Sequence, residues 1–349
     1  MRTRTYQESY RGLTALLPYP GAWGWYGALG VALVALPWLV PTYVMTYGTL
    51  ILIAATGAIG LNLVTGTAGL ISLGHAGFLA IGAYTTGILI TTYGWPLLPA
   101  LVASGVVAAA ASLLVGVPSL RLKGLYLAIT TLAFSIIVVQ LITQWDWLTR
   151  GSSGLPVRRP DVLGLSMRPP TAMYFLSLAG AVLVTLGALN LLRSRAGRAW
   201  AAIRDYDTAA SLMGVSLVRY KLLAFAVSAF ITGLAGALMA LNIRYLNVDS
   251  FELIASIEAI AMIIVGGLGS VRGAILGAIL ITVLPEFSRA VLGALGGPFG
   301  DVASGSTAEL KGVIYALVIM IFLRYEPDGL AHRWSRVKRF WSDWPYSRR

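Results

Sequence analysis

The residues best able to do chemistry in this sequence are a few polar side chains inside long apolar runs. Glu258 is the only well-placed acid near the middle of such a run. If the run spans a bilayer, an ionisable group there costs several kcal/mol unless it faces the bundle interior or water. Positions 254, 255, 261 and 262 are Ile, Ala, Ala and Met, so no basic partner lies one helical turn away. Glu258 therefore either lines a pathway or hydrogen-bonds to another helix.

Four further polar residues have apolar surroundings and are candidates for a solute path: Asn62, Ser72, His75 and Gln140. We expect them to act by hydrogen bonding, not by proton relay, and a lone polar side chain in a helix bundle usually bridges its neighbours. A dense set of glycines surrounds the first three and predicts a kinked or interrupted helix near the path: Gly66, Gly69, Gly74, Gly77 and Gly82.

No pattern supports catalysis by this chain. The sequence has no HExxH zinc pattern, no GxSxG elbow, no cysteine and only two histidines. It also has no GxxxxGK[ST] phosphate-binding loop, so we expect it not to hydrolyse ATP by itself. We therefore predict a protein that is not an enzyme and binds no cofactor or metal of its own; any energy from ATP must come from a partner.

The composition predicts an all-α membrane protein. Of 349 residues, 57% are hydrophobic and 11% are charged, against about 25% charged in soluble domains. A spanning helix needs about 20 apolar residues. On that basis we predict a single transmembrane domain, with tails at 1–24 and 325–349, a retained first helix and about ten spans: 25–42, 46–64, 72–92, 97–117, 124–144, 172–192, 221–241, 252–267, 272–290 and 310–324.

Basic residues predict the orientation. With both termini in the cytoplasm, 19 of the 26 Lys and Arg lie inside, which the positive-inside rule favours. The same clustering between apolar runs explains the net charge of +12 without nucleic acid. We interpret the basic, aromatic C-terminal tail as an interfacial anchor in the lipid headgroup layer. One external loop is basic, and it is either a docking surface or a solvated loop: Arg150, Arg158, Arg159 and Arg168.

Glycines spaced by four predict close helix packing. Gly269, Gly273 and Gly277 would share one helix face. Small residues let backbones touch in a membrane, where no hydrophobic effect drives helices together. Tight packing is the plain interpretation of this pattern.

Residues 193–220 are too polar to span and predict a helical segment in the cytoplasm. Small apolar residues alternate there with Arg and Asp, as in amphipathic helices that dock into a partner's groove. Within the segment, the run TAASLMG ends on Gly214, which favours a left-handed helix cap.

This segment resembles the coupling loop of bacterial ABC importer permeases, whose pattern is Glu-Ala-Ala, three residues, then Gly. Thr208, Ala209, Ala210 and Gly214 occupy those places, with Thr208 instead of the glutamate and Asp207 beside it. More of the chain resembles the longer permease of the high-affinity branched-chain amino acid importers, in the runs GLNLVTGTAGLISLGHAGFLAIGAY (60–84), RLKGLYLAITTLAF (121–134), AIRDYDTAASLMGVSLVRYKLLAFAVSAFITGLAGAL (202–238), SIEAIAMIIVGGLGSVRGAILGA (256–278) and LKGVIYALVIMIFLR (310–324).

The resemblance implies a subunit of an importer in the bacterial inner membrane. Its expected partners are a second permease, two ABC ATPases that use ATP and Mg²⁺, and a periplasmic or lipid-anchored binding protein. It also implies that the ATPases push the helix from Arg204 to Gly214.

Three alternatives stay open. Relatives of this layout move leucine, isoleucine and valine, which are therefore the expected substrates. Other relatives move urea or short amides, and these are the second choice of substrate. An ion-coupled secondary transporter would need midplane carboxylates, and Glu258 alone is weak support for it. A structural or assembly protein is disfavoured by the polar residues within the spans.

Overall fold

Long helices form most of the structure, a computed structural model that describes residues 20–161, 169–295, 317, 320, 324, 329–334 and 336. Most of the predicted span 310–324, most of the C-terminal tail and residues 1–19 lie outside the described residues. Each of the first nine predicted spans coincides with a helix: α2 (Pro20–Leu39), α3 (Thr42–Asn62), α4 (His75–Thr91), α5 (Leu97–Ser119), α6 (Leu125–Gln144), α8 (Pro170–Arg193), α11 (Leu217–Ile243), α12 (Leu253–Gly266) and α13 (Val271–Leu295).

Five described segments are long and apolar enough to cross a membrane: Thr42–Thr67, Leu97–Pro118, Leu125–Gln144, Pro170–Arg193 and Leu217–Ile243. Prolines stand at the start of several helices, where the missing N–H costs nothing. Pro41, Pro96 and Pro169 precede α3, α5 and α8 in extended backbone. The expected multi-pass helical membrane protein is confirmed at this level, whereas the number of ten spans and the position of the termini stay predictions.

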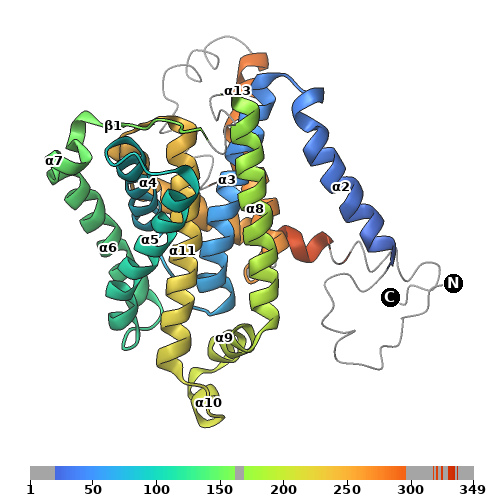
Figure 1. Ribbon diagram of the computed structural model, residues 1–349. Helices are drawn as coiled ribbons and strands as arrows, with labels where there is room; N and C mark the ends of the chain where they lie inside the picture. Colours follow the sequence, from blue (N-terminus) through green and yellow to red (C-terminus); the bar gives the residue numbers. More distant parts are fainter. Residues whose placement is uncertain are drawn as a thin grey trace.

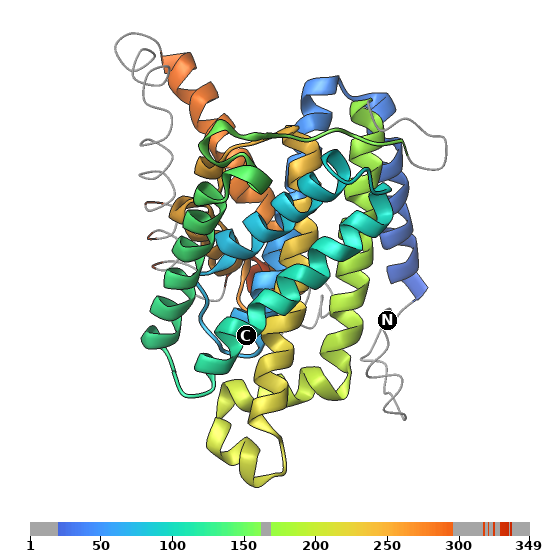
Figure 2. The same cartoon turned by 60° about the vertical axis from the view of Figure 1, so that its left-hand side comes forward.

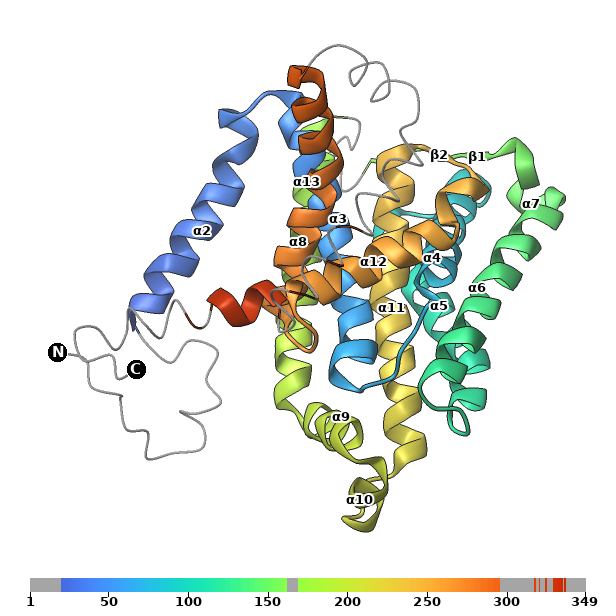
Figure 3. The ribbon, with the colours of Figure 1, turned by 180° about the vertical axis from the view of Figure 1, so that it is seen from behind.

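Helix α11 lies at the centre of the bundle and packs on α3, α4 and α5 (Figures 1 and 3). The contact with α4 brings backbone against backbone. A Cβ on Gly82 would overlap Gly233 of α11, and a Cβ on Gly236 would overlap the carbonyl oxygen of Leu79 in α4. Such close approach is how helices associate in lipid. By contrast, α2 lies at the edge of the bundle in Figure 1 and contacts it through α8, where the Tyr174 hydroxyl donates to Leu33 O at 2.8 Å.

The predicted interruption between the second and third spans is confirmed. Helix α3 continues as one π-helical turn, η1 (Leu63–Thr67). Residues 68–74 then run without regular structure before α4 begins at His75. The backbone N–H of Leu73 donates to Thr131 Oγ1 of α6 at 2.8 Å, which satisfies one of the polar groups that the open segment exposes.

Helices α12 and α13 form a hairpin with a short first arm. At about 1.5 Å per residue, the 14 residues of α12 extend about 21 Å, less than the roughly 30 Å of a bilayer core. The arms touch through glycine, because a Cβ on Gly273 would press on the carbonyl of Gly266 and one on Gly277 would overlap that of Met262. The prediction that Gly269 shares their helix face is wrong, since Gly269 has φ +78° and lies in the turn before α13.

Short elements cover the end of the bundle opposite α9 and α10 (Figure 2). They are α7 (Asp146–Thr149), η2 (Gly151–Ser153), the antiparallel pair β1 (Leu155–Pro156) and β2 (Tyr245–Leu246), and η3 (Val248–Phe251). The Arg159 guanidinium donates to the carbonyls of Leu241 (2.7 Å) and Asn242 (3.2 Å) at the end of α11. Burial, together with Arg244, lowers the pKa of Arg159. One arginine of this basic loop thus has a structural role; Arg168 lies outside the described residues.

Arg159→Met should therefore loosen this loop. The substitution keeps the apolar stem but leaves two helix-end carbonyls without their charged donor, which should cost about 1–2 kcal/mol. We expect faster protease cleavage within 150–161 and an unchanged bundle, measured by limited proteolysis in detergent. Arg158→Met is the matched control, and equal cleavage of both variants would contradict the role given to Arg159.

Candidate coupling site and transport path

Two short helices, α9 (Arg195–Asp205) and α10 (Asp207–Leu212), project from one end of the bundle (Figure 1). The predicted helical segment at 193–220 is therefore present, in two pieces. Ser194 caps α9 by accepting from Ala196 N at 3.1 Å. Trp200 is fully buried and donates to the carbonyl of Tyr220 at 2.8 Å, which anchors α9 to α11.

Helix α10 ends as the sequence predicts. Gly214 has φ +84°, its N–H donates to Ser211 O, and Val215 N donates back to Ala210 O at 3.0 Å. This paired bonding is the Schellman cap, for which glycine is the preferred residue. The cap turns the chain back towards α11 and leaves the tip of the segment facing outward.

The predicted coupling residues divide into two groups. Thr208, Ala209 and Gly214 are exposed, whereas Ala210 is buried. Arg204 and Asp207, in contrast, direct their polar atoms to the bundle: Arg204 Nη1 donates to Gly66 O at 2.8 Å, and Asp207 pairs with lysines from two other elements. The sequence did not reveal the large exposed side chains at the tip, Tyr206, Leu212 and Met213, which are 74, 83 and 87% exposed.

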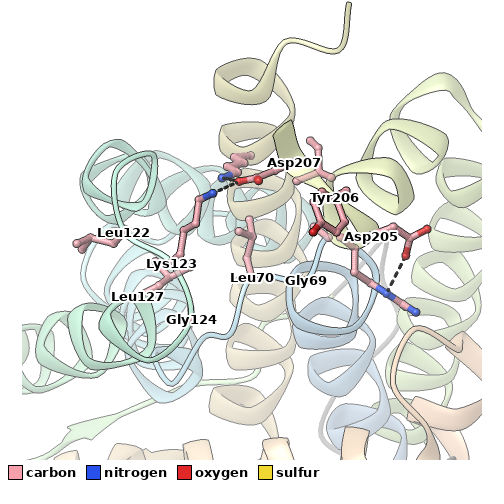
Figure 4. Close-up of a pocket in the computed structure, with 13 residues that line it drawn as sticks. Gly69, Leu70, Leu122, Lys123, Gly124, Leu127, Asp205, Tyr206 and Asp207 are labelled. Atoms are coloured by element: carbon pink, nitrogen blue, oxygen red, sulfur yellow. Dashed lines mark ion pairs between the residues drawn. The ribbon is translucent and has the colours of Figure 1, made fainter. Parts of the chain in front are cut away.

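Asp207 is the centre of a charge cluster at this end (Figure 4). Its Oδ2 lies 2.6 Å from Lys123 Nζ in the α5–α6 turn and 3.6 Å from Lys221 Nζ in α11. The hydrogen bond from Lys123 is the main reason that the pKa of Asp207 is lowered. Lys221 is buried, with 5% of its side chain exposed, and sequence reasoning missed it because it opens an apolar run.

A cavity of about 270 Å³ lies beside this cluster and is lined by it, by residues 68–70, by the α5–α6 turn and by the α9–α10 junction. Figure 4 shows Lys123, Asp205 and Asp207 around it. The segment of α9 and α10 is thus held to the bundle by buried side chains, chiefly Trp200 and Ile203, and by the polar contacts of Arg204 and Asp207, with a pocket beside those polar contacts.

Asn62 is buried at the C-terminal end of α3 and holds the turn of the α12–α13 hairpin. Its Nδ2 donates to Ser270 O at 2.8 Å, and its Oδ1 accepts from Gly269 N at 2.9 Å. Both amide atoms are therefore used, and Asn62 clamps a turn 208 residues away along the chain.

The other path candidates lie in separate surroundings. Ser72 and His75 are buried at the start of α4, and His75 packs against Gly57 of α3. Gln140 is exposed on α6, and Glu258 is half-buried in α12. Sequence reasoning also missed Glu286, which follows Pro285 in α13 and accepts from the hydroxyls of Tyr43 and Tyr47. The polar groups thus follow several helices and do not form one compact site.

Comparison with known proteins identifies the family. The profile described as "Branched-chain amino acid transport system / permease component" matches residues 40–323. The permease protein LivM of the high-affinity branched-chain amino acid transport system of Escherichia coli K12 is 37% identical over 87% of this chain and 73% of its own length.

Two shorter permeases are more distant. BraD of Pseudomonas aeruginosa is 26% identical, and LivH of Escherichia coli K12 is 24% identical, each over 79% of this chain and 90% of the relative. No solved structure matches the chain significantly. The match over most of the sequence and the apolar helical bundle agree with the resemblance seen in the sequence, and the chain belongs to the family of permease components of branched-chain amino acid transport systems.

Proposed function

We propose that this chain is one permease subunit of an ATP-driven importer that moves leucine, isoleucine and valine across the bacterial inner membrane. The substrate class is supported by relatives named as high-affinity branched-chain amino acid permeases, one of them 37% identical. The chain supplies the path and binds no cofactor for it, and ATP and Mg²⁺ are used by partner subunits.

The tip of α10 carries the proposal of ATP coupling. Tyr206, Leu212 and Met213 stand exposed beyond the bundle, on a capped helix that is anchored through Trp200. Apolar side chains on a short projecting helix fit a groove on a partner. We place an ATPase there, on the cytoplasmic side, where the basic residues of the segment also belong.

The remaining partners are a second permease and a solute-binding protein. Escherichia coli K12 has both a LivM and a LivH permease, which supports a pair of different permeases. The opposite end of the bundle, with its β1–β2 pair and basic loop, is where a binding protein outside the cell would dock. Affinity would then reside mainly in the binding protein and less in the dispersed polar groups of the path.

The first test is co-purification from native membranes in mild detergent. We expect the tagged chain to bring a second permease and an ATPase pair, identified by mass spectrometry. Changing Leu212 and Met213 together to Glu should remove the ATPases and keep the second permease, since both side chains lie outside the bundle. Trp147→Glu, at the opposite end and 76% exposed, is the control.

A wild-type chain purified without any ATPase would refute the ATP-driven function and favour the ion-coupled alternative. For the substrate, the assembled complex and its binding protein should take up leucine in proteoliposomes, with isoleucine and valine competing. Uptake of urea or short amides without competition by leucine would refute the proposed substrate class.

A further inference from the structure

Arg204 lies in α9, within residues 193–220, the proposed coupling segment, but its head group reaches the broken end of α3. Its Nη1 donates to the carbonyl of Gly66 at 2.8 Å, inside the π-helical turn. Carbonyls at a helix end lack a partner within the helix, and a basic side chain is a suitable donor for them. The contact therefore joins α9 to the end of α3 through one charged hydrogen bond.

The same turn contacts the tip of the α12–α13 hairpin. A Cβ on Gly66 would overlap the backbone of Gly269, and one on Gly269 would meet Arg204 Nη1 at 2.9 Å. Asn62, one turn before Gly66, grips this tip through both of its amide atoms. The guanidinium, the end of α3 and the hairpin tip thus meet at one junction, made of segments that are far apart in the sequence.

Further contacts extend from the hairpin to the start of α4. Ser256 Oγ in α12 accepts from the backbone N–H of Ala76 at 3.0 Å. A shift of the hairpin therefore acts on both sides of the open segment 68–74. Three of the path candidates lie along this stretch: Asn62 at the end of α3, Ser72 within the open segment and His75 at the start of α4.

We infer that Arg204 is a positioning residue that transmits movement of the coupling segment to the hairpin tip, through Gly66 and the Asn62 clamp. The inference rests on the ATP-driven function proposed above and names the link inside this chain. Movement of α9 displaces the Gly66 carbonyl, and the π-helical turn lets the end of α3 follow. The hairpin tip then moves with it, because Gly66 lies against Gly269 and Asn62 is hydrogen-bonded to Gly269 and Ser270. The adjacent cavity of about 270 Å³ gives α9 space to move. Single π-helical turns inside α-helices are frequent at functional sites.

The test uses the assembled complex in proteoliposomes, with ATP hydrolysis and leucine uptake measured in parallel. Arg204→Met keeps the apolar stem and removes the donor. We expect uptake to fall about tenfold, the lower end for loss of a charged hydrogen bond because the Arg204 side chain is 49% exposed. ATP hydrolysis should stay within about twofold of wild type. Arg198→Met is the control, because among the described residues Arg198, on the same helix, bonds locally, to Arg193 O. Equal losses of uptake and hydrolysis, or no loss of either, would overturn the inference.

A second variant and a direct probe keep the inference testable if Arg204→Met weakens assembly. Asn62→Ala should give the same uncoupling, since Asn62 is only 2% exposed and lies away from the docking tip. The chain has no cysteine, so Leu268→Cys places a single label at the half-exposed hairpin tip. ATP and vanadate should change its rate of maleimide labelling, and Arg204→Met or Asn62→Ala should abolish that change.

Each remaining outcome decides between the two proposals. The link through Arg204 would be rejected if ATP changed the labelling of Leu268→Cys equally with and without Arg204→Met or Asn62→Ala. It would also be rejected if ATP did not change the labelling of Leu268→Cys at all. A wild-type complex that lacks ATPases would instead reject the ATP-driven function, before any variant is compared.

Discussion

Asp207→Asn is expected to lower the free energy of unfolding by about 3 kcal/mol, the lower end of the cost of breaking a buried ion pair. Lys221 is the reason, because its side chain is 5% exposed and loses its carboxylate partner at 3.6 Å. The shorter bridge, from Lys123 at 2.6 Å, matters less because that lysine is 68% exposed. Unfolding in mixed detergent micelles, followed by tryptophan fluorescence, measures the difference.

Two control variants test whether the buried Lys221 or the closer but exposed Lys123 accounts for the loss of stability. Lys123→Met should cost about 0–1 kcal/mol, as exposed pairs do. Adding Lys221→Met to Asp207→Asn should recover most of the loss, since no charge is then buried alone. If Lys123→Met proves as damaging as Asp207→Asn, the shorter, exposed bridge holds the segment and our account of Lys221 is wrong.

The effect of pH has a defined sign. The pKa of Asp207 is lowered in the folded protein, chiefly by the hydrogen bond from Lys123. A lowered pKa contributes stability above the unfolded value of about 3.9, and this contribution is lost as the pH falls through the folded pKa. The difference between wild type and Asp207→Asn should therefore be constant near pH 7 and shrink below about pH 4. If the difference in unfolding free energy between wild type and Asp207→Asn grew on acidification, the ionised Asp207 carboxylate would not be the stabilising group.

Hydrophobic length was enough to place the helices. Nine predicted spans coincide with helices because about 20 apolar residues between polar turns leave a membrane chain few choices. A dense set of glycines predicted the break before His75, and the glycine at the end of TAASLMG predicted the left-handed cap at Gly214, because both features depend on local backbone freedom. The prediction that Gly269 shares a helix face with Gly273 and Gly277 was wrong. Residues spaced by four share a face only inside a helix, and α13 begins at Val271.

The sequence did not predict which side chains of the α9–α10 segment point towards the bundle and which point away from it. The pattern at 204–214 predicted a docking segment, but not that Arg204 and Asp207 would bond to the bundle and leave Leu212 and Met213 outside. A short amphipathic helix has two faces, and its own sequence does not say which one meets the protein. The hydrogen bonds of Asn62 to the hairpin turn were also not predictable from the sequence, because they join residues 208 positions apart.

Gly236→Ala should be among the most damaging single substitutions in the bundle. The new Cβ would overlap the carbonyl oxygen of Leu79 and press on Ala83 N, both backbone atoms of α4 that cannot rotate away. Helices α4 and α11 would have to separate and give up the neighbouring contact of Gly82 with Gly233. We expect a loss of about 3 kcal/mol, the upper part of the range for overpacking, and little folded protein in the membrane.

Gly187→Ala is the matched comparison, because a Cβ at this exposed position of α8 meets nothing within 4 Å. Alanine has the higher helix propensity by about 0.8–1 kcal/mol, so this variant should be as stable as wild type or more so. Fluorescence-detected size exclusion and thermal unfolding in detergent compare the two. If both variants accumulate and melt alike, the α4–α11 contact yields to an added methyl group. The glycines of this contact would then serve flexibility between transport states, and close packing would no longer explain them.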